Sequence, residues 1–206
     1  SNSALQTSGD VWMNAGNSVY SVDTTAVVTA NKLTIGNTNG SSLPGGVDLK
    51  GVNMVNTLAV QSDGGGILNF KNGKALTIGA GAFGINGIAA GGNPQPISIK
   101  TTVGDLTVAN GIVSDVLGGA TITLEAAGAL NINSAILSTY NASPSGPIKL
   151  VAGSGGISST VAGVITTNAL EVISGGTVSL NAPNVVTTLA ANVTGSGLGF
   201  TNSNGF

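Results

Sequence analysis

The stretch that decides the fold spans residues 96–180 and reads PISIKTTVGDLTVANGIVSDVLGGATITLEAAGALNINSAILSTYNASPSGPIKLVAGSGGISSTVAGVITTNALEVISGGTVSL. It holds four successive pairs of short triplets, most of which have apolar ends and a polar centre. That alternation is typical of a strand with one buried face. The first triplets of the pairs begin at residues 97, 122, 148 and 170, so the unit recurs every 22 to 26 residues. A repeat of this length predicts a solenoid.

Each unit also carries a third apolar patch, at residues 111–113, 135–137, 164–166 and 185–187. Three short strands per coil predict an all-β fold, a parallel β-helix with a triangular coil. Clusters of Gly and Asn should form its corners, because Gly supplies positive φ and Asn tolerates it. The apolar ends of the triplets should point inwards and stack in columns. The polar centres should point outwards, which would place Lys149 beside Glu171 on adjacent coils.

Candidate coil starts can be traced to both ends of the chain. They lie at residues 11, 33, 58, 76, 97, 122, 148, 170 and 198, with spacings of 18 to 28 residues. We therefore predict one domain over residues 1–206 with eight or nine coils. Residues 1–32 would form the N-terminal coil or cap, residues 97–197 the regular repeats, and residues 198–206 an incomplete last coil. Between residues 47 and 90 the register stays open, because 47–49 and 67–70 compete with the triplets at 58 and 76.

The composition excludes several classes of function. The 206 residues include six Lys, eight acidic residues, no His and no Cys, and the net charge is −2. Without His the chain lacks the commonest general base and metal ligand, and without Cys it has no disulfide or thiolate site. The charge leaves no basic surface for nucleic acid. No apolar run reaches the length of about 18 residues that a membrane helix needs.

Two features suggest chemistry, and we favour a structural interpretation of both. Residues 79–84 read GAGAFG and fit the G-x-G-x-x-G pattern of a dinucleotide site. The glycines and prolines that follow cannot form the helix that such a site needs, so we expect a corner of the β-helix. The acidic residues are scattered, and only Asp105 and Glu125 could approach on adjacent coils, where we expect two solvated corner acids. We therefore expect no catalytic residue, metal site or cofactor, and no enzyme.

Units such as residues 120–132 (ATITLEAAGALNI), 175–182 (GGTVSLNA) and 197–202 (GLGFTN) resemble the repeats of filamentous-haemagglutinin-type adhesins. These adhesins are large exoproteins of two-partner secretion, and related repeats occur in autotransporter passengers. The resemblance covers residues 97–206 well and the first third of the chain poorly. It implies a right-handed parallel β-helix that a bacterium secretes or displays, acting as a stalk or adhesive fibre in cell adhesion or a biofilm. The family's repeat implies no catalytic or binding residue.

One hypothesis concerns the two ends of the β-helix. The nine residues from 198 to 206 and the ten before Val11 together make one coil length. The last coil of one copy would then be completed by the first segment of the next, forming a head-to-tail filament. The residues expected at this interface are Ala4, Leu5, Val11, Trp12, Leu198, Phe200 and Phe206.

Two alternatives remain open at this point. The open coil could instead adjoin neighbouring coils of a longer chain. The chain could also be a monomeric adhesin segment whose loops 91–96 and 141–147 bind a glycan or a host receptor, because variable loops on one edge of a solenoid are where surface function usually lies. All of these interpretations place the protein outside the cell or on its surface.

Overall fold

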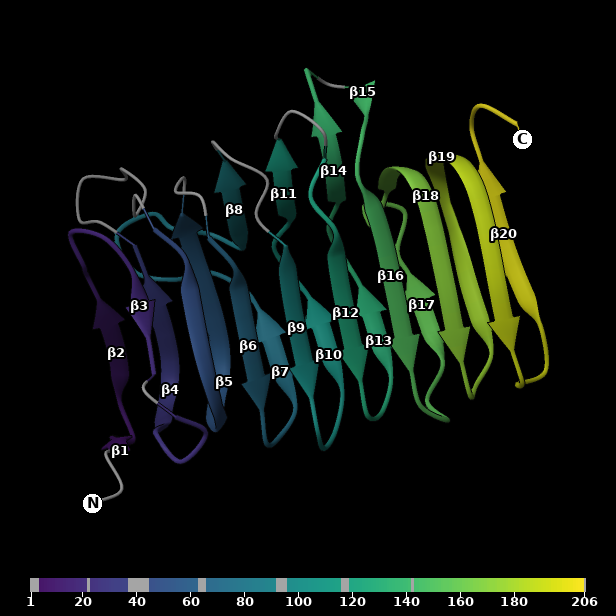
Figure 1. Ribbon diagram of the computed structural model, residues 1–206. Coiled ribbons are helices and arrows are strands. Elements are labelled where there is room, and N and C mark those ends of the chain that lie inside the picture. Colours follow the sequence, from purple (N-terminus) through teal and green to yellow (C-terminus); the bar gives the residue numbers. More distant parts are fainter. Residues whose placement is uncertain are drawn as a thin grey trace.

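The computed structural model describes residues 4–21, 23–36, 45–62, 66–91, 96–115, 119–141 and 143–205. These residues form twenty strands and no helix. The strands wind into one solenoid with the N- and C-terminal ends of the chain at opposite ends of the rod (Figure 1). The predicted all-β parallel β-helix is therefore confirmed.

Strands of successive coils pair in parallel and build three sheets along the rod. The first sheet contains β1 (Ala4–Gln6), β3 (Val19–Tyr20), β6 (Leu68–Asn72), β9 (Ile97–Thr101), β12 (Ile122–Ala126) and β16 (Pro147–Ala152). The second contains β2 (Asp10–Met13), β7 (Leu76–Ile78), β10 (Leu106–Val108), β13 (Leu130–Ile132), β17 (Ile157–Ser159) and β20 (Leu198–Asn202). The third contains β8 (Ile88–Gly91), β11 (Ile112–Asp115) and β14 (Ile136–Tyr140). Four long strands bend from one sheet into the next: β4 (Val27–Ile35), β5 (Val47–Ser62), β18 (Ile165–Ser174) and β19 (Val178–Val193).

Two antiparallel pairings occur among the described residues. The short strand β15 (Ser143–Pro144) folds back on β14 as a hairpin. Ala80 and Asn86 form an isolated antiparallel bridge within a loop.

The register of the first sheet gives the number of turns in the solenoid. One column of paired residues runs through Val19, Val47, Leu68, Ile97, Ile122, Ile148, Leu170 and Leu189. These eight levels are separated by seven full turns, and a part turn precedes the first level and follows the last. The predicted eight or nine coils match this count when the part turns are included.

The register also corrects the predicted coil starts. In the structure Leu68, not Leu76, pairs with Ile97 in the first sheet, whereas Leu76 pairs with Leu106 in the second. The predicted starts at 11, 33, 58, 76 and 198 belong to the second sheet, and those at 97, 122, 148 and 170 to the first. The two sheets were confused because their triplets share one apolar–polar–apolar pattern at similar spacings.

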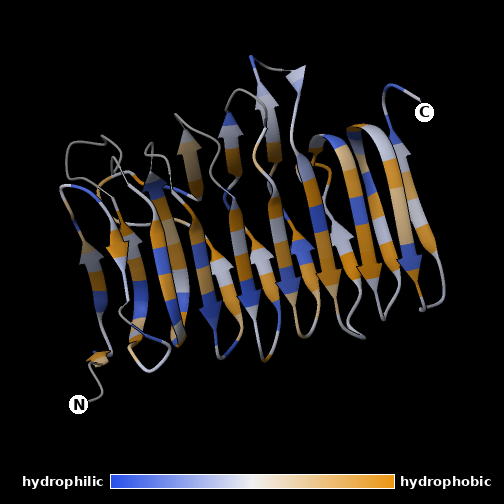
Figure 2. Cartoon of the chain, viewed as in Figure 1, coloured by the Kyte–Doolittle hydropathy of each residue, from blue (hydrophilic) through white to orange (hydrophobic). Residues whose placement is uncertain are grey.

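The core is a set of apolar columns that fills the rod from end to end. Along the regular strands, such as β9, β12 and β16, buried positions alternate with more exposed ones, and Figure 2 shows hydrophobic and hydrophilic bands along the strands. The predicted inward column Ile99, Leu124, Leu150 and Val172 is fully buried. Each buried side chain of this size contributes about 1.5–3 kcal/mol of hydrophobic stabilisation, so burial on this scale can offset the chain entropy lost on folding.

Buried asparagines replace backbone groups where a strand turns a corner. The Asn53 Oδ1 accepts a hydrogen bond from the Val28 N–H of the preceding coil, and its Nδ2 donates to the Lys71 carbonyl of the following coil. Asn184 repeats this arrangement with the Ile165 N–H and the Thr201 carbonyl. Both side chains are fully buried. The sequence predicted corner asparagines for their tolerance of positive φ, but among non-glycine residues described here only Phe83 and Asn141 adopt it.

Hydroxyl groups close individual coils at the end of the third sheet. The Ser138 hydroxyl donates to the Ala120 carbonyl and the Thr167 hydroxyl to the Gly146 carbonyl, in each case just before the first-sheet strand of the same coil. The Ser62 hydroxyl makes the equivalent bond to the Gly45 carbonyl. These bonds satisfy carbonyls that the corner would otherwise leave buried and unpaired.

Truncating the central apolar column should destabilise the solenoid. Leu124→Ala removes a fully buried side chain between Ile99 and Leu150 and should lower the free energy of unfolding by about 2–5 kcal/mol. Chemical denaturation followed by far-UV circular dichroism measures this change. The outward neighbour Thr123→Ala should change it by less than about 0.5 kcal/mol. Equal effects of the two substitutions would contradict the assigned facing of the strand.

Replacing a corner asparagine with alanine should lower the free energy of unfolding more than replacing a nearby surface asparagine. Asn184→Ala leaves the buried Ile165 N–H and Thr201 carbonyl without their partner, which should cost about 1–3 kcal/mol of stability. The same denaturation experiment with Asn181→Ala is the control, because the Asn181 side chain is exposed and, among the described residues, donates to the Ser179 hydroxyl instead of to a buried backbone group. A loss no larger than that of the control would show that the asparagine side chain is dispensable at this corner.

Candidate functional site

At the C-terminal end of the rod, the described strands have a neighbouring strand on one side only. Strand β20 pairs only with β19, and the last six residues of β19 pair only with β18, among the residues that the structure describes. Inward side chains that are buried in earlier coils are half-buried here, as for Leu189, Val193 and Phe200, which pack against the core from one side. The sequence contains no charged residue after Glu171. This end therefore presents open backbone and apolar side chains without a charge.

The N-terminal end is open in the same way. Within the described chain β1 and β2 pair only with β4, so the opposite edge of each strand has no partner. Leu5 is 46% exposed, and Val11 and Met13 cover the core from one side only. The rod thus has two open ends with similar chemistry.

The predicted interface residues fall at these two ends, with one correction. Ala4 and Leu5 lie on β1, Val11 and Trp12 on β2, and Leu198 and Phe200 on β20. Phe206 lies outside the described residues. Leu198 pairs with Val178 in the second sheet, so the coil that contains it begins at Leu189 and not at Leu198. Val11 lies in the same sheet, so the hypothesis that residues 198–206 of one copy and residues 1–10 of the next complete one coil stays a prediction.

Sequence reasoning missed Leu189 and Val193 at the C-terminal end. Both face inwards on the last first-sheet segment of β19, in line with Leu170 and Ser174 of the coil below. Their signal was present as the alternation of apolar residues at positions 189, 191 and 193. It was overlooked because the search for coil starts passed directly from 170 to 198.

Residues 79–87 form a loop that runs back along the side of the rod. The loop leaves the second sheet after β7 and is closed by a hydrogen bond from the Gly87 N–H to the Gly79 carbonyl. Its Ala82 N–H donates to the Thr34 hydroxyl at 2.9 Å, and its Ile85 side chain is buried. Thr34 and Ala59 face outwards, yet they are almost fully buried because the loop covers them. The GAGAFG motif is therefore a lateral cover over two preceding coils, not the simple corner that was predicted.

The tip of this loop reaches the first coil. The Phe83 and Trp12 ring centroids lie 4.6 Å apart with a tilt of 50°. The Trp12 Nε1 donates to the Gly36 carbonyl, which fixes the indole against the side of the solenoid. Phe83 has a φ of 54°, an unusual value for a bulky residue, and remains 54% exposed. Trp12 is thus held by two contacts beside the open N-terminal edge.

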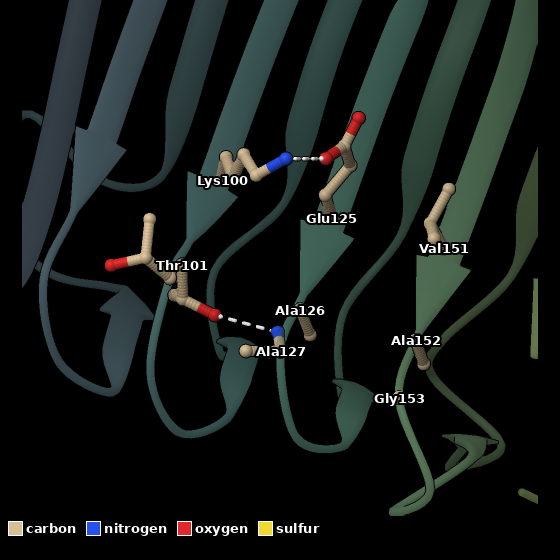
Figure 3. A pocket seen from close by; sticks show the side chains of 9 residues that line it. Lys100, Thr101, Glu125, Ala126, Ala127, Val151, Ala152 and Gly153 are labelled. Carbon is tan, nitrogen blue, oxygen red and sulfur yellow. Dashed lines mark hydrogen bonds and ion pairs between the residues drawn. The ribbon is translucent and has the colours of Figure 1, made fainter. Parts of the chain in front are cut away.

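Charged side chains gather on the outer face of the first sheet. Lys149 and Glu171 form the predicted ion pair at 3.1 Å, and Lys100 and Glu125 form another at 2.5 Å. A shallow groove beside Lys100 and Glu125 continues past Val151, as Figure 3 shows. Exposed pairs of this kind are worth about 0.2–1 kcal/mol, so they support the register without anchoring the fold. The one carboxylate that lines the groove is already paired with lysine, so the groove offers no pair of acids for hydrolysis.

Two other acidic residues, Asp105 and Asp23, accept hydrogen bonds from backbone N–H groups of loops. The Asp105 carboxylate accepts a hydrogen bond from the Ala129 N–H, so Asp105 and Glu125 have separate partners. The hydroxyl and then the backbone N–H of Thr25 lower the pKa of the Asp23 carboxyl by donating hydrogen bonds to it. Among the described residues no three metal-ligating side chains come together, and no helix is long and apolar enough to cross a membrane.

The two predicted recognition loops are described in part. Residues 92–95 and 142 lie outside the described residues. The β14–β15 hairpin projects beyond the solenoid at one corner (Figure 1). Tyr140 at its tip is 39% exposed, and the Asn141 N–H donates to the Asp115 carboxylate of the preceding coil. The hairpin is therefore tied to its neighbour and presents one aromatic side chain.

Comparison of the chain with protein-family models, with curated proteins and with solved structures finds no match.

The lateral loop can be tested through the single tryptophan of the chain. A Cβ on Gly81 would lie 2.6 Å from the Ala59 Cβ, so Gly81→Ala should lift the loop and separate Phe83 from Trp12. We expect red-shifted Trp12 emission and stronger quenching by acrylamide. Gly197→Ala is the control, because a Cβ there meets no atom within 4 Å. Unchanged emission in Gly81→Ala would contradict close packing of the loop on Ala59.

Proposed function

We propose that this chain is a non-enzymatic structural or adhesive β-solenoid that works outside the cell or on its surface and extends by stacking coils at its ends. The observation that carries this proposal is that, among the described residues, the strands at both ends of the rod pair with a neighbouring strand on one side only and cover core side chains that are partly exposed. Solenoid proteins that remain separate generally carry terminal repeats with a polar outer face. Neither described end of this rod has such a face.

The physical gain from stacking comes from two sources. Full burial of an apolar side chain stabilises by about 1.5–3 kcal/mol, and completing the burial of a partly exposed side chain contributes part of this free energy. Each added strand also pairs a row of backbone groups that now face solvent. Several side chains and two strands acting together can offset the cost of association, which one contact alone cannot.

The surface location and the adhesive role rest on the resemblance of the repeats to filamentous-haemagglutinin-type adhesins. A rod of stacked coils suits a stalk or fibre, since it holds its two ends apart at a fixed length. The proposal of a non-enzymatic role is supported by the described acidic side chains, whose carboxylates contact lysine, threonine, asparagine or backbone groups.

Self-association is the direct test. Sedimentation velocity and electron microscopy of the purified chain should reveal rods that lengthen with protein concentration. Val193→Glu and Phe200→Glu place a charge among the apolar groups of the C-terminal end and should return the protein to single rods. Val161→Glu is the matched control, since Val161 is 85% exposed away from both ends. Single rods of the unmodified protein at all concentrations would overturn the stacking part of the proposal.

A second candidate function is recognition of a glycan or host receptor by the edge loops. The projecting β14–β15 hairpin with exposed Tyr140 favours it, because a rigid aromatic side chain on a tethered loop suits ligand contact. Binding to a glycan array that is lost in Tyr140→Ala and kept in Tyr20→Ala would support this role. Tyr20 is 70% exposed and lies in the first coils, distant in sequence from the hairpin.

A further inference from the structure

The tip of the loop at residues 79–87 is a tight turn with an unusual occupant. The Ile85 N–H donates a hydrogen bond to the Ala82 carbonyl across the turn. The two central residues are Phe83 and Gly84, whose φ values are 54° and 76°. Turns with positive φ at both central positions prefer asparagine, aspartate and glycine. A bulky phenylalanine in this conformation is strained.

Packing alone does not account for a phenylalanine at this position. Phe83 is 54% exposed, so about half of its surface gains nothing from burial. The loop is already attached to the rod by the buried Ile85 side chain and by the hydrogen bond from the Ala82 N–H to the Thr34 hydroxyl. Strained residues that the surrounding structure holds in place cluster at functional sites and ligand clamps. The strain at Phe83 therefore points to a ligand.

Phe83 and Trp12 together form an exposed aromatic surface. Their ring centroids lie 4.6 Å apart, and Trp12 is 37% exposed although its Nε1 bonds to the Gly36 carbonyl. Val11 and Met13 on either side of Trp12 pack against the core, so the indole faces outwards from the second sheet. A further strand would add at the edge of that sheet and not on its face. The two rings are thus reached from the side of the rod.

A row of hydrogen-bonding side chains crosses the coils next to this aromatic surface. Asp10 lies two residues before Trp12 on β2 and faces outwards as well. Its carboxylate accepts a hydrogen bond from the Asn31 Nδ2, and the Asn31 Oδ1 accepts one from the Asn56 Nδ2. All three side chains are exposed. Carboxylate and amide groups can form more hydrogen bonds than these, so the row can also bind a ligand.

An aromatic surface beside a row of amides matches the chemistry of a neutral sugar. A pyranose ring has an apolar face of C–H groups, which packs on an aromatic ring, and hydroxyl groups at its rim, which bond to amides and carboxylates. Outward residues two apart on a strand are separated by about 6.6 Å, a distance that an oligosaccharide can cover. Lys32 pairs in register with Asp10 and balances its charge, which favours a neutral ligand over a cation.

From these observations we infer that the side of the first coils binds a neutral oligosaccharide. Phe83 and Trp12 stack on the sugar rings, while Asp10 and Asn31 bind the hydroxyl groups. The strained turn holds Phe83 in position before the ligand arrives, which lowers the entropy cost of binding. The site is separate from the β14–β15 hairpin, and the inference does not rest on the stacking of coils.

The turn supplies a substitution that separates binding from folding. Phe83→Asn removes the ring and introduces a residue that favours positive φ, so the loop should stay closed. Isothermal titration calorimetry with cellohexaose, chitohexaose and maltohexaose measures the affinity. We expect the unmodified chain to bind at least one of these probes, and Phe83→Asn to bind it about tenfold or more weakly. Circular dichroism verifies that the variant is folded.

Two further measurements place the ligand on the rings and on the polar row. The bound oligosaccharide should shift the emission of Trp12, the single tryptophan, and protect it from acrylamide. Asn31→Ala should weaken binding by about threefold to tenfold, because it removes one hydrogen-bonding partner. Trp12→Ala leaves the turn residues unchanged and should weaken binding as Phe83→Asn does. Val161→Ala is the control, since Val161 is exposed and distant in sequence from the site.

Three outcomes would overturn the inference. Equal affinities of the unmodified chain and Phe83→Asn, or no binding to any of the three probes, would show that Phe83 only covers Trp12. Binding that is lost in Tyr140→Ala and kept in Phe83→Asn would place the glycan site at the hairpin. A shift of Trp12 emission with choline chloride, but not with the oligosaccharides, would assign the aromatic pair to a cation.

Discussion

The whole structure depends on parallel backbone pairing between one coil and the next. Each coil is too thin to bury its own apolar residues, so it is stable only with a neighbour on each side. In this chain the pairing aligns identical or similar side chains over seven turns, and the core is a consequence of that alignment. The same dependence explains why the two end coils are the chemically incomplete parts of the molecule.

Corners limit this arrangement, because a strand that bends between sheets leaves buried N–H and carbonyl groups. The chain meets this need with Asn53, Asn72 and Asn184, whose amides bind to backbone groups of adjacent coils, and with hydroxyls such as that of Ser138. A corner asparagine therefore acts as a side-chain extension of the ladder. Corners built in this way stay narrow enough for three sheets to surround one apolar core.

Much of the fold could be predicted from the sequence, because alternation and repeat length are direct consequences of stacking. The pairing of Ile97, Ile122, Ile148 and Leu170 and the Lys149–Glu171 ion pair are confirmed. The choice between Leu68 and Leu76 could not be made, since triplets of two sheets look alike when only their spacing is known. The described residues predicted for the end interface lie on β1, β2 and β20, whereas Leu189 and Val193 on β19 were missed because coil starts were followed from one sheet into another. The role of the loop at residues 79–87 depends on contacts with Thr34 and Trp12 that are distant in sequence and leave no periodic signal.

The loop at residues 79–87 makes the two ends of the rod differ in their resistance to unfolding. In a plain solenoid each coil contacts only its neighbours, so coils can detach one at a time from either end. Here Phe83 and Ala82, from the coil that begins at Leu68, contact Trp12 and Thr34 in much earlier coils. The first coils are therefore held together by contacts that span several turns, whereas each of the last coils contacts only its neighbours. Under tension along the axis, the rod would peel from its C-terminal end and keep its N-terminal block whole.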